Sequence, residues 1–388
     1  MDVSEQLTRV DAATVAAVAR QALGRPAAQV GRWEHRVAYG GLGVVRGTNS
    51  LLRVSGEATD GGRPAPWSAY LKLTRVPPAD APHAHAVTHN EYWRREIATY
   101  ESALPAQLPE GLATPRCYGV VDAGDCVHLW LEDVREDGGP WSLARYGLAG
   151  RHLGRFNGQY LAGRPRPAYP WLTRGFLRAR ADRNAPFWAR LDALRARPLF
   201  GAMFPGDTAD RSRRLFADRH ALLDALDRLP QTLVHQDADR RNLLGRGGAP
   251  GVVETVAIDW AYAGVGAVGA EAAPLAVSSV LRTKGVGPED LPALETHVFE
   301  GYLAGLQDAG WRGDARLARL GYAATVALRY GPLLGLPLQL EADEQQRAAL
   351  TQTLGHPFEE AVVRYGRMLP HVLDRADEAR RLLAALTV

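Results

Sequence analysis

Lysine is nearly missing from this chain. Of its 46 basic residues only Lys72 and Lys284 are lysines, and the other 44 are arginines. An ammonium group is a compact point charge, whereas a guanidinium group is a broad planar fork, so the two are not interchangeable at a binding site. Unless it survives by chance, a lysine in such a chain indicates a position that arginine cannot fill. Lys72 is therefore a candidate functional residue.

Cysteines and long apolar runs are also scarce. Two cysteines, Cys117 and Cys126, are too few for a disulfide framework and lack metal-ligand spacing, so we expect free thiols. No stretch of about 18 apolar residues could span a bilayer, and the N-terminus lacks the regions of a secretory signal. A formal charge of +3 over 388 residues indicates neither a nucleic-acid nor a membrane partner. We expect a cytoplasmic protein.

The order of strand-like and helix-like segments predicts an α+β fold with two lobes. Residues 1–30 are predicted to form an N-terminal helical segment with Asp11 as its N-cap, and residues 31–134 a β-rich small lobe. Residues 135–388 are predicted to form a mainly helical large lobe. We expect a cleft between the two lobes.

Apolar periodicity and turn residues predict individual elements within these lobes. Strands are expected at residues 32–39, 51–54, 67–73, 117–121 and 126–131, and helices at residues 90–102, 141–161, 291–309, 316–330 and 357–386. Alternation along the third strand places Lys72 on the opposite face from Leu71 and Leu73.

The central motif follows a short apolar run at residues 233–234. It has the pattern H-x-D-x-x-x-x-N, formed by His235, Asp237 and Asn242, and Asp259 follows 17 residues later at the end of a second apolar run. One carboxylate can orient an attacking hydroxyl, while an amide and a second carboxylate can hold Mg²⁺ on nucleotide phosphates. Asp and Asn after a strand also build ordinary turns. The combination of both pieces favours phosphoryl transfer.

These motifs resemble the aminoglycoside phosphotransferase and choline-kinase-like branch of the protein-kinase-like fold, over roughly residues 31–275. That pattern is H-G-D-x-x-x-x-N followed by I-D-[WF], and Gln236 stands here in place of the glycine. The resemblance implies that Asp237 is the catalytic aspartate and that Asn242 and Asp259 bind Mg²⁺. It also implies that His235 braces the loop rather than reacts.

The same resemblance implies a nucleotide site for ATP or GTP in the small lobe. Lys72 would bind the α and β phosphates, with Glu96 as its first-choice partner and Glu91 as the alternative. The remaining nucleotide contacts would come from a covering loop after residue 47 and from the backbone of the interlobe hinge, which together hold Thr48, Asn49, Ser50, Glu132 and Val134. Glu271 would brace the site rather than take part in catalysis.

The resemblance implies a hydroxylated small-molecule acceptor, bound in the large lobe beside the catalytic loop, and local composition indicates the charge of this acceptor. Residues 142–234 hold 17 arginines and no lysine against 7 aspartates and no glutamate, and residues 282–388 are only slightly acidic. A polycationic aminoglycoside would need more carboxylates. We expect a neutral or anionic acceptor, such as a sugar or a nucleoside-type or macrolide-like antibiotic, the latter phosphorylated for resistance or self-protection. The alternative is a kinase of a primary metabolite, such as a sugar, choline or an amino-acid derivative. The acceptor could stack on Trp141, Trp171 or Trp188, although we favour a role in core packing for each of these tryptophans.

Two rival interpretations remain open at this point. A metal-dependent hydrolase would use His235, Asp237 and Asp239 as ligands, but the sequence offers no second cluster of this kind. A non-catalytic nucleotide-binding relative would not need the full set of charged residues that this chain has kept. Turnover of ATP distinguishes the second rival from an enzyme.

Overall fold

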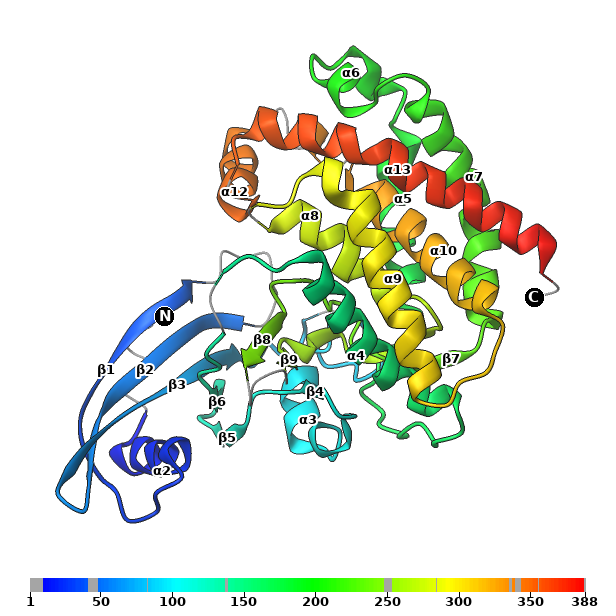
Figure 1. The fold of residues 1–388 in the computed structure, drawn as a ribbon. Coiled ribbons are helices and arrows are strands. Elements are labelled where there is room, and N and C mark those ends of the chain that lie inside the picture. The colour runs from blue at the N-terminus through cyan, green and yellow to red at the C-terminus, as the bar shows by residue number, and fades with distance from the viewer. Residues whose placement is uncertain are drawn as a thin grey trace.

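The computed structural model describes residues 10–40, 48–81, 83–136, 139–247, 253–283, 285–334, 337–338, 343–354 and 356–386. They form a small lobe built on a β-sheet and a larger, mainly helical lobe beside it (Figure 1). The predicted two-lobed α+β architecture is confirmed. Within these ranges, no helix combines the length and the apolar character needed to cross a bilayer.

The small lobe contains a five-stranded antiparallel sheet in the order β1-β2-β3-β6-β5. Its elements are α2 (Ala12–Leu23), β1 (Gln29–Gly40), β2 (Thr48–Asp60), β3 (Arg63–Arg75), α3 (Arg95–Glu101), β5 (Cys117–Asp122) and β6 (Cys126–Glu132). Strand β4 (Leu112–Ala113) comes between α3 and β5 in the sequence but pairs with a strand of the large lobe. The first three strands are longer than the sequence predicted. Cys117 and Cys126 do not form a disulfide with each other, as expected.

Helix α2 covers one face of this sheet. Asp11 caps the helix by accepting a hydrogen bond from the Thr14 amide at 2.6 Å, which confirms the predicted N-cap. Val15 of α2 belongs to the same buried cluster as Leu71 and Leu73 of β3. Because side chains alternate along a strand, Lys72 points to the other face, toward the large lobe.

The helix expected at residues 90–102 is shorter than predicted. It begins only at Arg95, and residues 90–94 form turns. The buried guanidinium of Arg95 bonds the carbonyls of His89 and Asn90, the latter at 3.1 Å. These carbonyls are therefore satisfied by a side chain, and the preceding segment does not need helical hydrogen bonds.

The large lobe combines long helices with two small sheets, β10-β7 and β4-β9-β8. Its elements are α4 (Leu143–Leu161), α5 (Phe176–Ala189), α6 (Phe200–Met203), α7 (Thr208–Arg228), β7 (Gln231–Val234), β8 (Leu243–Gly247), β9 (Val253–Ala257), β10 (Gly264–Ala267), α8 (Ser279–Arg282), α9 (Leu291–Asp308), α10 (Ala315–Leu334), α12 (Glu344–Leu354) and α13 (Phe358–Ala385). The predicted helices at residues 141–161, 291–309, 316–330 and 357–386 correspond to α4, α9, α10 and α13.

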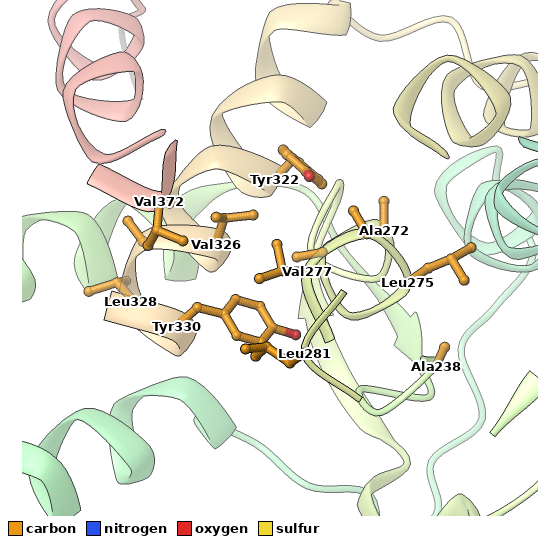
Figure 2. Close-up of a cluster of buried hydrophobic side chains, with 14 of the residues drawn as sticks. Ala238, Ala272, Leu275, Val277, Leu281, Tyr322, Val326, Leu328, Tyr330 and Val372 are labelled. Carbon is orange, nitrogen blue, oxygen red and sulfur yellow. The ribbon is translucent and has the colours of Figure 1, made fainter. Parts of the chain in front are cut away.

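A buried apolar cluster fixes α10 against the segment that follows β10 (Figure 2). Val277 and Leu281 lie beside Val326 and Tyr330 of α10, and all four side chains are fully or almost fully buried. The Tyr330 hydroxyl and the Ser278 hydroxyl are hydrogen-bonded at 2.8 Å. This packing fixes the position of the adjacent residue on α10, Arg329, whose side chain reaches the candidate site.

Candidate active site

The sheets of the large lobe bring the two parts of the central motif together. His235–Asn242 is the loop between β7 and β8, and Asp259 follows directly after β9. Strands β8 and β9 pair in antiparallel fashion with Leu243 opposite Ala257. The Ile258 amide then donates to the Asn242 carbonyl at 2.9 Å. Strand pairing therefore places Asn242 beside Asp259, although they are 17 positions apart in the sequence.

Backbone contacts hold the loop in one conformation. His235 is fully buried, and its Nδ1 accepts from the Asp237 amide at 3.2 Å while its Nε2 donates to the Ile258 carbonyl at 2.9 Å. Burial lowers the pKa of His235, which favours the neutral ring. Both ring nitrogens are occupied, so this histidine supports the loop, in line with the bracing function that the resemblance implies.

Glu271 supports the same loop by binding its backbone. It is fully buried and accepts the amide hydrogens of His235 and Gln236, the latter at 3.1 Å. Burial raises the pKa of Glu271 to about 7, although the two amides favour its charged form. Its contacts are with the loop backbone, as expected for a bracing residue.

Gln236 keeps a conformation that suits glycine. Its φ is +70°, in the left-handed region, which costs an L-residue roughly 1–2 kcal/mol. Three contacts hold it there, because its amide donates to Glu271, its carbonyl accepts from Arg329, and its side chain donates to Thr173 Oγ1 at 2.6 Å. These contacts therefore stabilise the left-handed backbone at Gln236, and its side chain links the loop to Thr173.

Lys72 lies between two carboxylates across the lobes. Its ammonium donates to Glu96 of α3 and to Asp259 Oδ1 at 3.2 Å. Burial alone would lower the pKa of Lys72, but the negative charges of Asp259 and Glu96 outweigh it and raise that pKa. Of the two candidate partners, the structure pairs Lys72 with Glu96, whereas Glu91 accepts from Arg183 at 2.8 Å.

The neighbouring Arg95 anchors the helix that carries Glu96. Besides the two loop carbonyls, its guanidinium donates to Trp171 O at 2.6 Å and to Ala261 O at 3.0 Å, both in the large lobe. A buried guanidinium with so many acceptors is a rigid connection. It ties α3 to the segment just after Asp259 and so holds Glu96 beside Lys72.

The residues predicted to contact the nucleotide lie only in part within the described residues. Ser50 is buried in β2, whereas residue 47 and the side chains of Thr48 and Asn49 lie outside the described part of the chain. Glu132 ends β6, and its carboxylate accepts from Arg246 at 2.7 Å. Val134 follows in the connection to α4.

Of the three tryptophans considered for stacking, Trp171 and Trp188 are each only 7% exposed and belong to the large core. Trp141 is half-buried and donates from its indole nitrogen to Glu136 Oε1 at 3.0 Å.

The sequence did not reveal Arg329, which contacts Asp237 directly. Arg329 of α10 is 5% exposed and donates to Asp237 Oδ1 at 2.6 Å, while Asn242 Nδ2 donates to Asp237 Oδ2 at 3.1 Å. Burial alone would raise the pKa of Asp237, but the charges of Arg329 and Arg282 outweigh it and lower that pKa. Asp237 is therefore a carboxylate at neutral pH.

The ligand set of the rival hydrolase does not form. In the part of the chain that the structure describes, no group of three or more His, Cys, Asp and Glu side chains is arranged to hold a metal ion. Asp239 is fully buried and pairs with Arg241 at 3.2 Å and Arg282 at 3.6 Å. It braces the loop with arginines instead of joining His235 and Asp237.

A cavity of about 260 Å³ lies behind the loop. Its described lining includes Phe176, Gln236, Glu271 and Arg329 but not Asp237. It is therefore adjacent to the carboxylate without containing it.

Comparison with solved structures places this architecture among known folds. A choline kinase from Cryptosporidium parvum Iowa II superposes with a TM-score of 0.51 and 13% sequence identity, over 96% of this chain and 98% of that chain. The chain has the two-lobed fold of choline kinase. An amicoumacin kinase solved in complex with AMP-PNP, Ca²⁺ and Ami gives a TM-score of 0.49 and 15% identity, over 96% of both chains. No protein-family model and no curated protein matches this chain in sequence.

Proposed function

We propose that this protein is a small-molecule O-phosphotransferase, which transfers the γ-phosphate of ATP to a hydroxyl group. The observation that carries the proposal is the convergence of Lys72, Glu96 and Asp259 at one end of the cleft with Asp237 and Asn242 beside them. Phosphoryl transfer requires mainly alignment of the hydroxyl and compensation of phosphate charge. These five side chains supply both.

Asp237 orients the acceptor. Its carboxylate accepts the hydroxyl hydrogen, the hydroxyl oxygen forms a bond to the γ-phosphorus, and the bond from that phosphorus to the bridging oxygen breaks to release ADP. The hydroxyl proton passes to Asp237. Because the neighbouring arginines lower the pKa of Asp237, it is a weak base, and its main contribution is to hold the hydroxyl in line.

The donor set suits a magnesium ion. Asn242 donates a hydrogen bond from Nδ2 to Asp237, so the amide oxygen of Asn242 can bind a metal ion. The side chain of Asp259 is 34% exposed, and Lys72 contacts only its Oδ1. Amide and carboxylate oxygens are the ligands that Mg²⁺ takes in sites completed by phosphates and water. The ion would neutralise charge on the phosphates, and Asn242 and Asp259 would hold it there.

The remaining assignments concern the nucleotide and the acceptor. Lys72 would contact the α and β phosphates, Thr48, Asn49 and Ser50 would cover them, and backbone groups near Glu132 and Val134 would bond the adenine. The acceptor would be a neutral or anionic hydroxyl compound, such as a nucleoside-type or macrolide-like antibiotic or a sugar. The arginines beside Asp237 support this choice, because they would repel a polycation.

A panel of hydroxylated acceptors tests the function. Neutral, anionic and polycationic compounds are incubated with ATP and Mg²⁺, and the gain of one phosphoryl group is followed by mass spectrometry. Asp237→Asn should lower kcat by about 10²- to 10⁴-fold while nucleotide binding is retained. Asp182→Asn is the matched control, because Asp182 is exposed on α5.

Two outcomes would contradict the assignment at different levels. Transfer that Asp237→Asn leaves unchanged would exclude Asp237 as the group that orients the hydroxyl. Efficient turnover of polycationic aminoglycosides alone would leave the reaction intact and exclude the acceptor class.

A further inference from the structure

Two arginines from different helices meet beside Asp237. Arg180 belongs to α5 and Arg329 to α10, and these helices pack against each other. The guanidinium carbons of Arg180 and Arg329 lie 5.3 and 5.5 Å from the ring centre of the same residue, Phe176. Because Phe176 and Arg180 are four positions apart on α5, they share one helix face. Both guanidinium groups therefore lie near one aromatic ring, and the charge of Arg329 acts on Arg180.

Arg180 differs from the other arginines of residues 142–234. Many of them donate to aspartates or to backbone carbonyls, as Arg178 does to Asp224 and Asp227. The arginines that form no hydrogen bond or ion pair with a described residue are solvent-exposed, except Arg180, which is half-buried. They are Arg166, Arg174, Arg180, Arg190, Arg197, Arg214 and Arg228. Burying part of a guanidinium without an acceptor is unfavourable unless a ligand supplies one.

The charges around Arg180 do not balance. Asp237 is already bonded to Arg329 at 2.6 Å and to Asn242. Burial and the positive charge of Arg329 lower the pKa of Arg180 to about 10, and Tyr262 and Asp237 offset this only in part. Two cations thus share one carboxylate, which leaves an excess of positive charge where the acceptor would approach.

The wall beside the two arginines is aromatic and polar. The rings of Phe176 and Tyr262 are 5.3 Å apart, and the charges of Asp237 and Arg180 both act on the Tyr262 hydroxyl. Tyr262 belongs to the short 3-10 turn that follows Asp259. It therefore connects the proposed phosphate end of the site with the arginine pair.

We propose that Arg180 and Arg329 form an anion-binding subsite of the acceptor pocket, so that the preferred acceptor carries a carboxylate or phosphate group near the hydroxyl that Asp237 orients. This inference rests on the proposed phosphotransferase function and narrows its acceptor to an anionic class. Guanidinium groups bind both kinds of anion through paired N–H donors. Arg180 is the group free to bind the anion, and Arg329 bonds Asp237 and adds its charge.

Matched acceptor pairs test the subsite. Glucuronate is compared with glucose, and uridine 5′-monophosphate with uridine, by mass gain with ATP and Mg²⁺ and by calorimetric titration into the protein saturated with Mg²⁺ and a non-hydrolysable ATP analogue. The two anions distinguish a carboxylate from a phosphate as the preferred group. The anionic member of at least one pair should bind and react more efficiently than its neutral partner.

Variants of Arg180 separate binding from structure. Arg180→Gln should raise KM or Kd for the anionic acceptor by about 10- to 100-fold, with little change for the neutral one. Arg180→Lys should recover part of the loss because the charge is retained. Arg183→Gln is the matched control, since Arg183 lies three residues further along α5 and pairs with Glu91 at the surface.

The outcomes distinguish this inference from the function on which it rests. Equal or better use of the neutral acceptors, or a preference for anions that Arg180→Gln leaves unchanged, would overturn the subsite while the kinase assignment stands. Failure of every anionic probe to bind a protein that still binds the ATP analogue would also overturn it. A protein that binds no nucleotide would overturn the phosphotransferase function and the subsite together.

Discussion

On the nucleotide side of the proposed site one lysine faces two carboxylates, whereas on the acceptor side one carboxylate faces two arginines. Lys72 contacts Glu96 and Asp259, and Asp237 contacts Arg329 with Arg180 close by. The first arrangement carries excess negative charge and suits a cation such as Mg²⁺. The second carries excess positive charge and suits an anion. The sign of the unbalanced charge thus indicates what each side would bind.

The two sides also differ in how they are built. The nucleotide side joins both lobes, because Lys72 and Glu96 come from the small lobe and Asp259 from the large one. The acceptor side lies within the large lobe, where α5, α10 and the loop after β7 pack together. Relative movement of the lobes would therefore change the first set of contacts and leave the second intact.

The largest effect is expected from removing the charge that balances Asp237. Arg329→Met would leave this carboxylate buried beside Gln236 without its closest cation, and loss of one member of a buried pair costs about 3–5 kcal/mol. We expect the free energy of unfolding, measured with denaturant, to fall by that amount. Arg329→Met combined with Asp237→Asn should recover part of the loss. An unchanged unfolding midpoint in the single variant would show that the pair is not a stabilising contact.

On the opposite side, Lys72→Met should leave two carboxylates without their cation. We expect kcat to fall by about 10²- to 10³-fold, as when a preorganised charge is removed from a phosphate site, and nucleotide binding to weaken. Lys284→Met is the control, because it removes the only other lysine of the chain. Comparable losses in both lysine variants would mean that Lys72 has no special function.

The proposed metal site can be tested through its dependence on Mg²⁺. Asp259→Asn keeps an oxygen ligand but removes its charge, so the Mg²⁺ concentration for half-maximal rate should rise by about 100-fold. Asp314→Asn, at an exposed aspartate paired with Arg316, should show the parental dependence. Activity that survives complete chelation of divalent ions would contradict this assignment of Asn242 and Asp259.

The smallest effect concerns pH. Burial raises the pKa of Glu271 from 4.5 to about 7, so between these values the folded state holds more protons than the unfolded state. The free energy of unfolding should therefore decrease as pH rises from about 4.5 to 7, by on the order of 1–3 kcal/mol. Glu271→Gln should flatten this slope in denaturant titrations across that window. A slope that is identical in the variant would exclude Glu271 as its source.

Local pattern predicted much of the fold because the relevant signals are contiguous. The Asp11 cap, the alternation around Lys72 and the long amphipathic helices of the large lobe are short-range features, and the structure confirms them. The predicted start of α3 was wrong because the Arg95 side chain donates hydrogen bonds to carbonyls of the preceding loop. Such a tertiary contact has no signature in the helix itself.

By itself, the sequence determined which residues are available for phosphoryl transfer, since Asp237, Asn242, Asp259 and the rare Lys72 form recognisable local motifs. Only the tertiary structure decided that Lys72 pairs with Glu96 and that Asp237 is bonded to Arg329. Arg329 lies 92 residues after Asp237 and Arg180 lies 57 before it, in helices where arginine is common. A contact between such distant positions depends on how the helices pack, and that packing follows from the whole buried core rather than from any one segment.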